Sequence, residues 1–275
     1  WGVSCGLCVS GCSDGNRPPL PAVRGLPYDA LYLPMDRGAD QVRADVRALA
    51  DLGATRVYFT CSEADLADDR KLRHTIDAAH ALGLQVFAGP YFGGVFSGDE
   101  GDTARLYFAV SGGDHEVSRR GVIAPKPAHN APALHAYLGR QVRHLLTYDV
   151  DGILLDEPWF PQPATADDYY PYDATSQSMF AAQFGHPMPD RDDAEVELFR
   201  QRSMTALLRE LTDLAKQIRP GLQTALVVLP EVDLLMRDVN GTRDWQALAD
   251  IPSLDELHTD PYWPTRGLSF SPLNI

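Results

Sequence analysis

The chain has 275 residues, 44% of them hydrophobic and 23% charged, which are the proportions of a globular protein. The formal net charge of −14 argues against nucleic-acid backbones and anionic membranes as partners, since both are negatively charged. No apolar run approaches the ~18 residues of a membrane-spanning helix. No signal peptide is visible, but the chain begins with Trp1 rather than Met, so its location stays open, with the cytoplasm favoured over secretion.

Residues 1–27 form a Cys-, Gly- and Pro-rich segment, which we interpret as a leader or linker. Cys5, Cys8 and Cys12 have the spacing C-x2-C-x3-C, and with Cys61 as fourth ligand they would suit zinc or an iron–sulfur cluster. The sequence lacks the second C-x2-C or the His pair that would complete a familiar metal site. We therefore predict neither a metal nor a cofactor, and a disulfide is the alternative role of these cysteines.

From residue 28 onward, short apolar stretches alternate with amphipathic ones. In the amphipathic stretches apolar residues recur every three or four positions, as Val42, Val46 and Leu49 do, and a glycine such as Gly53 follows. The predicted strands are residues 30–35, 55–60, 84–88, 153–155, 222–229 and 254–259. The predicted helices are residues 39–52, 68–82, 133–148, 176–184, 192–218 and 244–249.

Six strand–helix repeats indicate a parallel sheet covered by helices. An open doubly wound sheet would carry a glycine-rich phosphate loop after its first strand, whereas the sequence there is Met35-Asp36-Arg37-Gly38. We therefore predict an α/β fold, a (β/α)8 TIM barrel over residues 28–275 that is incomplete at the C-terminus. The roughly 35 residues after Gly94 break the rhythm and predict a long loop, in which Arg120 and His129 are lid candidates.

Every predicted strand ends in an acid or an aromatic residue. Because the C-terminal strand ends of a barrel surround one pocket, these side chains are expected to meet. Aromatic faces pack on the C–H groups of sugars and carboxylates accept hydrogen bonds from sugar hydroxyls, so the pattern favours a carbohydrate substrate. The strand ends read Asp36-Arg37, Ser62-Glu63, Tyr91-Phe92, Asp156-Glu157-Pro158-Trp159, Glu231, and Asp260-Pro261-Tyr262-Trp263.

The stretch Asp-Gly-Ile-Leu-Leu-Asp-Glu-Pro-Trp-Phe at residues 151–160, with Asp-Pro-Tyr-Trp at 260–263, resembles glycoside-hydrolase-like TIM-barrel proteins of bacteria. The resemblance covers roughly residues 28–263 and implies hydrolysis or transfer of a glycosidic bond. Similarity to α-glycosidase and α-galactosidase barrels would make Asp156 the nucleophile and Asp260 the general acid/base. Similarity to the large retaining β-glycosidase clan would make Glu157 the acid/base, although that clan has Asn where this chain has Asp156.

We predict Asp156, Glu157 and Asp260 as catalytic residues and favour Glu157 as general acid, with Asp156 as its partner or nucleophile. Neighbouring side chains on a regular strand point to opposite sides, so only one of Asp156 and Glu157 is expected to face the barrel axis. For Glu63 a helix start at Ser62 is the alternative interpretation. The predicted substrate-binding residues are Asp36, Glu63, Tyr91, Trp159, Glu231, Tyr262 and Trp263.

Two other functions stay open. One is a carbohydrate-binding barrel without catalysis. The other is a metal-dependent hydrolase or lyase with oxygen ligands, and zinc is disfavoured there because His258 is the one histidine at a predicted strand end. The ligands of such a metal would be Asp36, Glu63, Asp156 and Asp260. The sequence leaves the sugar, its anomer, the stereochemical outcome and the oligomeric state open.

Overall fold

The structure is a computed structural model that describes residues 28–32, 37–90, 107, 114–161, 163–165, 167–228 and 241–259. Residues 1–27, with Cys5, Cys8 and Cys12, lie outside this part of the chain. Six of the predicted site residues also lie outside it: Asp36, Tyr91, Glu231, Asp260, Tyr262 and Trp263.

The core is a parallel sheet of six strands in the order β1-β2-β3-β6-β7-β8. All five neighbouring pairs are parallel, and the six strands lie in the sheet in the same order as in the sequence. Each predicted strand is therefore confirmed within the described residues. The strands are β1 (Tyr28–Tyr32), β2 (Ala54–Cys61), β3 (Gln85–Pro90), β6 (Gly152–Asp156), β7 (Gln223–Val228) and β8 (Glu256–Thr259).

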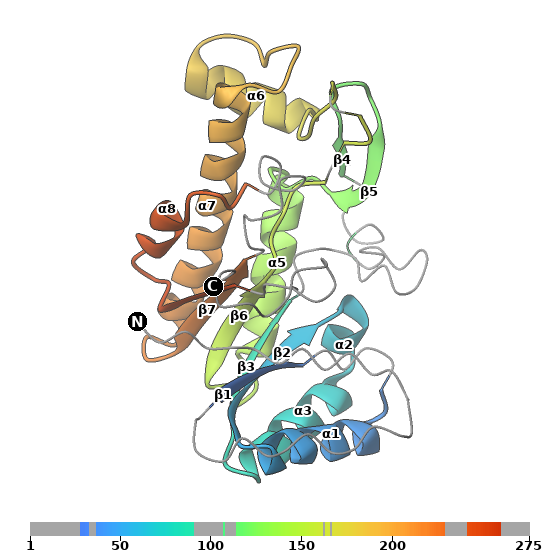
Figure 1. Ribbon diagram of the computed structural model, residues 1–275, viewed down its shortest axis with the longest axis vertical. Coiled ribbons are helices and arrows are strands. Elements are labelled where there is room, and N and C mark those ends of the chain that lie inside the picture. The colour runs from blue at the N-terminus through green and yellow to red at the C-terminus, as the bar shows by residue number, and fades with distance from the viewer. Residues whose placement is uncertain are drawn as a thin grey trace, which may run out of the picture.

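The helices lie outside the curled sheet, where α1 packs against α3 and α5 packs against α7 (Figure 1). All six predicted helices are present, and four of them begin at a side-chain cap, Asp68, Asp173, Asp193 or Asp244, which accepts hydrogen bonds from first-turn N–H groups. A short helix that the prediction does not include precedes α3. The helices are α1 (Ala39–Asp51), α2 (Glu63–Ala67), α3 (Asp69–His80), α5 (Pro132–Leu145), α6 (Ala174–Phe184), α7 (Ala194–Ile218) and α8 (Trp245–Ala249).

Alternate residues on the strands belong to two separate hydrophobic clusters. Val57, Phe59 and Ile153 join the large cluster that includes the buried helix residues, so they mark the outer face of the sheet. Tyr58 and Leu154, which alternate with them, join a small cluster made of strand residues alone. The second cluster is the inside of the barrel, because side chains alternate between the two faces of a strand.

An ionic network across the inside of the sheet shows how strongly the sheet is curled. In a flat sheet β2 and β8 would lie about 19 Å apart, four strand spacings of ~4.8 Å. Yet Nη1 of Arg56 on β2 donates to both carboxylate oxygens of Glu256 on β8, at 2.9 and 2.7 Å. The hydroxyl of Tyr58 donates to Glu256 at 2.7 Å, and Nε2 of His258 lies 2.9 Å from the same carboxylate. Six parallel strands curled in this way, with helices outside, form an incomplete (β/α)8 barrel.

The interpretation of the segment after Gly94 as one long loop is wrong for its described part. Strands β4 (His115–Val117) and β5 (Ile123–Pro127) form an antiparallel hairpin, separate from the six-stranded sheet (Figure 1). The alternation of buried and exposed residues along β5 is hidden in the sequence, because β5 reads Ile-Ala-Pro-Lys-Pro. Proline argues against a strand except at a sheet edge. A two-stranded hairpin has only edges, so both prolines are tolerated.

Two glycines allow β3 and β6 to approach closely. A Cβ on Gly89 would lie 1.6 Å from the carbonyl oxygen of Leu154, and a Cβ on Gly152 would lie 2.3 Å from the ring of Phe87. Neither position has room for a side chain. None of the helices in the described residues is both long enough and apolar enough to cross a membrane.

Replacing Glu256 should weaken the fold in a pH-dependent way. Hydrogen bonds from His258 and Tyr58, together with the charge of Arg56, lower the pKa of Glu256 to about 2. Since its unfolded pKa is about 4.3, the stabilisation is fully present above pH ~4.3 and is lost as the pH falls toward 2. We expect Glu256→Gln to lower the free energy of unfolding by about 1–2 kcal/mol at pH 6, after discounting for solvent screening.

Urea unfolding of both proteins at pH 6 and pH 2.5 measures this effect. The difference in free energy of unfolding between the wild-type protein and Glu256→Gln should be smaller at pH 2.5 than at pH 6. Glu210→Gln is the matched control, because the Glu210 side chain is 54% exposed. An equal loss of unfolding free energy for Glu256→Gln and Glu210→Gln at pH 6 would contradict the stabilising role of Glu256. A difference between wild type and Glu256→Gln that does not change with pH would contradict it as well.

Gly89→Ala should prevent normal packing of β3 on β6. The new methyl group would overlap the backbone of Leu154, which cannot move without breaking the sheet, so we expect a loss of at least about 3 kcal/mol or no folded protein. Gly221→Ala is the control, since a Cβ there meets nothing within 4 Å. Thermal unfolding followed by circular dichroism measures both, and a Gly89→Ala protein as stable as the control would refute the close approach.

Candidate active site

Asp156 is the last residue of β6 and lies at the C-terminal end of the barrel interior. It follows Leu154 of the inner cluster by two residues and is only 2% exposed. Its Oδ2 accepts a hydrogen bond of 2.8 Å from Oγ1 of Thr60, which follows Tyr58 of the same cluster by two residues on β2. The two side chains meet across β3, at the level of Gly89. Reacting groups of (β/α)8 enzymes come from this end of the strands.

Glu157 leaves regular strand geometry. Its φ is +46°, in the left-handed region that residues other than glycine rarely adopt, at a cost of order 1 kcal/mol. Its backbone N–H donates to the carbonyl oxygen of Val227 on β7 at 2.9 Å, and the residue is 7% exposed. The rule that adjacent side chains point to opposite sides therefore applies up to Asp156 and not to Glu157.

The β4–β5 hairpin brings a buried cation beside Glu157. Lys126 on β5 is 7% exposed, and its Nζ lies 3.0 Å from the centre of the Trp159 ring. Burial lowers the pKa of Lys126 to about 7, although the negative charges of Glu116 and Glu157 oppose that shift. One face of the partly exposed Trp159 ring is thus occupied by the Lys126 side chain.

A second buried acid lies on the same hairpin. Glu116 on β4 is fully buried, and its Oε1 accepts hydrogen bonds from the backbone N–H of His129 and from its Nδ1, both at 2.8 Å. Burial raises the pKa of Glu116, while His129 opposes that shift. The His129 ring packs on Phe160 at 4.6 Å between centroids. His129, a lid candidate, is therefore enclosed between the hairpin and the segment after β6.

Backbone hydrogen bonds fix the hairpin to the segment that follows β6. The Arg119 N–H donates to Tyr169 O at 2.9 Å, and the Tyr172 N–H donates to Val117 O at 2.7 Å. Asp168 accepts from the backbone N–H of Arg120 at 3.0 Å, and the Arg120 side chain pairs with Asp167 at the surface. Lys126 and Glu116 are thereby positioned by the same loop that carries Trp159.

Glu63 is the first residue of α2 and contacts two tyrosines. Its Oε1 accepts a hydrogen bond of 2.9 Å from the backbone N–H of Tyr107 and one of 2.7 Å from the hydroxyl of Tyr137 on α5. The interpretation as a helix start is confirmed, because Ser62 and Asp65 form a capping box around α2. Its role as a sugar ligand stays a prediction.

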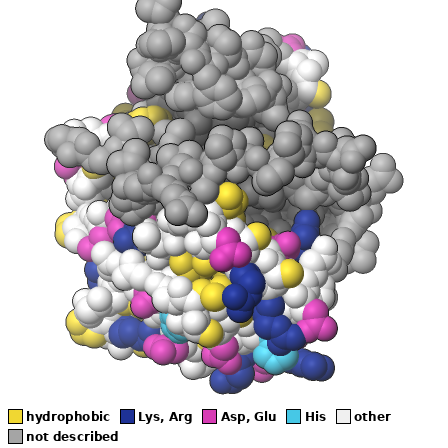
Figure 2. Space-filling model, turned by 60° about the horizontal axis from the view of Figure 1, so that its bottom comes forward, with side chains coloured by type: hydrophobic (Ala, Val, Ile, Leu, Met, Phe, Trp, Pro, Cys, Tyr) yellow, Lys and Arg dark blue, Asp and Glu magenta, His cyan; other side chains and the backbone are white. Residues whose placement is uncertain are grey.

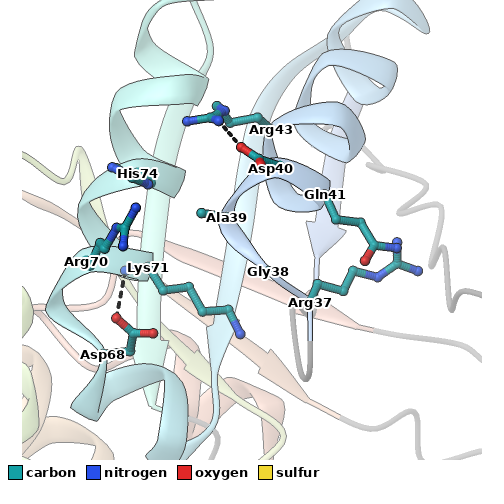
Figure 3. Close-up of a pocket in the computed structure, with 10 residues that line it drawn as sticks. All are labelled: Arg37, Gly38, Ala39, Asp40, Gln41, Arg43, Asp68, Arg70, Lys71 and His74. Carbon is teal, nitrogen blue, oxygen red and sulfur yellow. Dashed lines mark hydrogen bonds and ion pairs between the residues drawn. The ribbon is translucent and has the colours of Figure 1, made fainter.

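A separate cavity of about 530 Å³ lies between the amino-terminal ends of α1 and α3 (Figure 3). Its cations are largely neutralised by nearby acids: Arg37 pairs with Asp45 at 2.8 Å, Arg43 with Asp40, and Lys71 with Asp65. On the face shown in Figure 2, Lys and Arg side chains are likewise interspersed with Asp and Glu. Neither Asp156 nor Glu157 lines this cavity, and its charges do not single out a ligand. The lining residues are Arg37, Gly38, Ala39, Asp40, Gln41, Arg43, Asp68, Arg70, Lys71 and His74.

Within the described ranges, no group of three or more His, Cys, Asp or Glu residues is arranged to hold a metal ion. Asp36 and Asp260, two of the four ligands of the metal-dependent alternative, lie outside those ranges. His258, near the C-terminal end of β8, belongs to the ionic network with Tyr58 and Glu256.

Sequence reasoning missed three residues that surround the acidic pair: Thr60, Glu116 and Lys126. Thr60 was hidden inside an apolar strand, and only the inward period from Tyr58 would have indicated it. For Lys126 the sequence holds no such signal, because a lysine between prolines predicts an exposed loop residue.

Comparison with protein-family models gives no match, and neither does a search of curated proteins. Solved structures do match, at low sequence identity. They include β-galactosidases from the psychrophilic Marinomonas ef1 (TM-score 0.61, 11% identity), the Antarctic haloarchaeon Halorubrum lacusprofundi (0.63, 15%) and Rahnella sp. R3 (0.62, 15%). The matches cover 86%, 84% and 88% of this chain but only 40%, 39% and 40% of those proteins. The chain thus shares its barrel fold with β-galactosidases and spans about two fifths of their length.

Removal of the Thr60 hydroxyl should destabilise the protein, because Asp156 loses the hydrogen bond from its neighbour across β3. Thr60→Val keeps the shape of the side chain but withdraws a hydrogen bond from a buried carboxylate, which typically costs about 1–3 kcal/mol. Thr60→Ser restores the hydroxyl and is the matched control. Urea unfolding at pH 7 measures both, and equal stability of the two variants would contradict the inferred contact.

Proposed function

We propose that this protein is a glycoside hydrolase whose carboxylates at the C-terminal strand ends cleave, or transfer, a glycosidic bond. The observation that carries the proposal is the buried Asp156–Glu157 pair at the end of β6, in a fold shared with β-galactosidases. The net charge of −14 suits a neutral sugar rather than a polyanion. Galactosides are the first substrates to test, because the similar structures are β-galactosidases.

In the proposed mechanism Glu157 is the general acid and protonates the leaving glycosidic oxygen. A second carboxylate acts on the anomeric carbon or on a water molecule, and Asp156 and Asp260 are the candidates. A separation of the two reacting carboxyl groups near 5–5.5 Å would predict retention of configuration, and one of about 6.5–9.5 Å would predict inversion. Trp159 and the remaining predicted substrate-binding residues would surround the sugar ring.

Substitution of each proposed catalytic acid should abolish most of the activity. We expect Asp156→Asn, Glu157→Gln and Asp260→Asn each to lower kcat/KM by at least about 100-fold on the best disaccharide or alkyl glycoside of a panel that begins with galactosides. A nitrophenyl glycoside has an activated leaving group that needs little protonation, so Glu157→Gln should recover activity on it while a variant of the second carboxylate should not.

Glu210→Gln, an exposed substitution, is the control and should keep full activity. Full activity of all three acid variants would refute the proposal. Sugar binding by calorimetry without turnover of any substrate on the panel would instead favour the carbohydrate-binding barrel. Full activity in the presence of a chelator would exclude the metal-dependent hydrolase or lyase.

A further inference from the structure

Lys126 differs from the other fully buried cation in the described part of the chain. Arg200, 1% exposed, donates to the carbonyl oxygen of Tyr170 at 3.0 Å and to both oxygens of Asp192 at 2.8 and 2.9 Å. By contrast, Nζ of Lys126 has no hydrogen-bond partner among the described residues. Its neighbour is the Trp159 ring, 3.0 Å away. The Arg200 guanidinium is thus held by three hydrogen bonds from its Nη atoms, two of them to a carboxylate, whereas the Lys126 ammonium has no hydrogen bond of this kind to any residue that the structure describes.

Such an arrangement is costly for stability alone. A buried ammonium without hydrogen bonds loses its hydration, and a cation–π contact offsets only part of that loss. Burial therefore favours the neutral amine over the ammonium and lowers the pKa of Lys126 to about 7. Perturbed groups of this kind cluster at functional sites, since their protonation can change in the working pH range.

The charged groups that face Lys126 come from two elements. Glu116 is on β4, the partner strand of the hairpin, and is itself bound by His129 beyond the end of β5. Glu157 follows β6, and its negative charge acts on Lys126. Trp159, from the same segment as Glu157, closes the remaining side. Lys126 is therefore coupled to the residue that the proposed mechanism uses as its acid.

We propose that Lys126 is a positioning residue of this site: its ammonium, held on the Trp159 ring, fixes the segment that carries both Trp159 and Glu157 and so orients the Glu157 carboxyl group. The role assigned to Glu157 rests on the proposed function, whereas the coupling between Lys126 and Glu157 does not. Below pH ~7 Lys126 is an ammonium and holds the Trp159 ring, and with it the segment that carries Glu157, by a cation–π contact. Above that pH it is a neutral amine and this contact is weakened.

The first experiment measures the proton on Lys126 without any activity. The chain has lysines at positions 71, 126 and 216, so NMR of lysine labelled with 13C and 15N at the side-chain end gives few signals, and Lys126→Arg assigns the signal in question. We expect its titration midpoint to lie about 7, with Lys71 and Lys216 as internal references.

Glu157→Gln should move that midpoint to lower pH, because it removes a negative charge that stabilises the ammonium; the expected change is at least about half a pH unit. Glu116→Gln should act in the same direction, and Glu210→Gln should leave the midpoint unchanged. A midpoint near 10.4, or one that Glu157→Gln does not move, would overturn the proposal. This outcome is independent of whether a glycoside is ever hydrolysed.

The second experiment uses the best glycoside found for the wild-type protein. Activity should decline with a limb near pH 7 as Lys126 loses its proton. Lys126→Arg keeps a cation at every accessible pH, so the limb should move to higher pH by at least about one unit. Lys126→Met should remove the limb and lower kcat by about tenfold or more, with KM changed less. A structural role would change stability but leave the position of the limb unchanged, and an unshifted limb in Lys126→Arg would refute the positioning role.

Discussion

Side chains on the parallel strands alternate between the helices outside the sheet and the space inside it, and every inward feature of the molecule obeys that two-residue period. Along β2 alone the inward residues are Arg56, Tyr58 and Thr60. Arg56 joins the ionic network with Glu256, Tyr58 joins the apolar inner cluster, and Thr60 binds Asp156. One strand therefore contributes to the floor of the barrel, to its middle layer and to the candidate site. A shift of one residue would place all three side chains among the helices.

Curling of the sheet converts this period into a site. Arg56 and Glu256 meet although three strands separate β2 from β8, and Thr60 meets Asp156 across β3. The second contact requires that nothing project from β3 between them, and Gly89 meets that requirement. Regular geometry then ends at Glu157, whose left-handed backbone turns the chain away from the strand. Backbone strain of this kind persists only where the surroundings fix it, and it concentrates at functional positions.

The sequence was sufficient to predict the barrel and the acidic pair, since both depend on local patterns. Six apolar stretches of strand length and six amphipathic stretches define the order of elements, and Asp156 and Glu157 directly follow one such stretch. The network of Arg56 and Glu256 joins residues 200 positions apart, which no local pattern reveals. The hairpin was missed because Pro125 and Pro127 argue against a strand, although an isolated two-stranded hairpin has no interior position for them to disrupt.

Lys126 could not be found from the sequence for a deeper reason. A lysine between prolines predicts an exposed loop residue, because lysine is rarely buried without a partner. Its burial results from the backbone bonds that join the hairpin to the segment after β6, and these bonds bring Lys126 onto Trp159 and toward Glu157. Arg200 shows how this chain holds a buried cation elsewhere, because its guanidinium forms an ion pair with Asp192. Lys126 is a second buried cation, and burial lowers its pKa to about 7. Packing alone does not explain why the fold bears this energetic cost, whereas a role in positioning Glu157 would explain it.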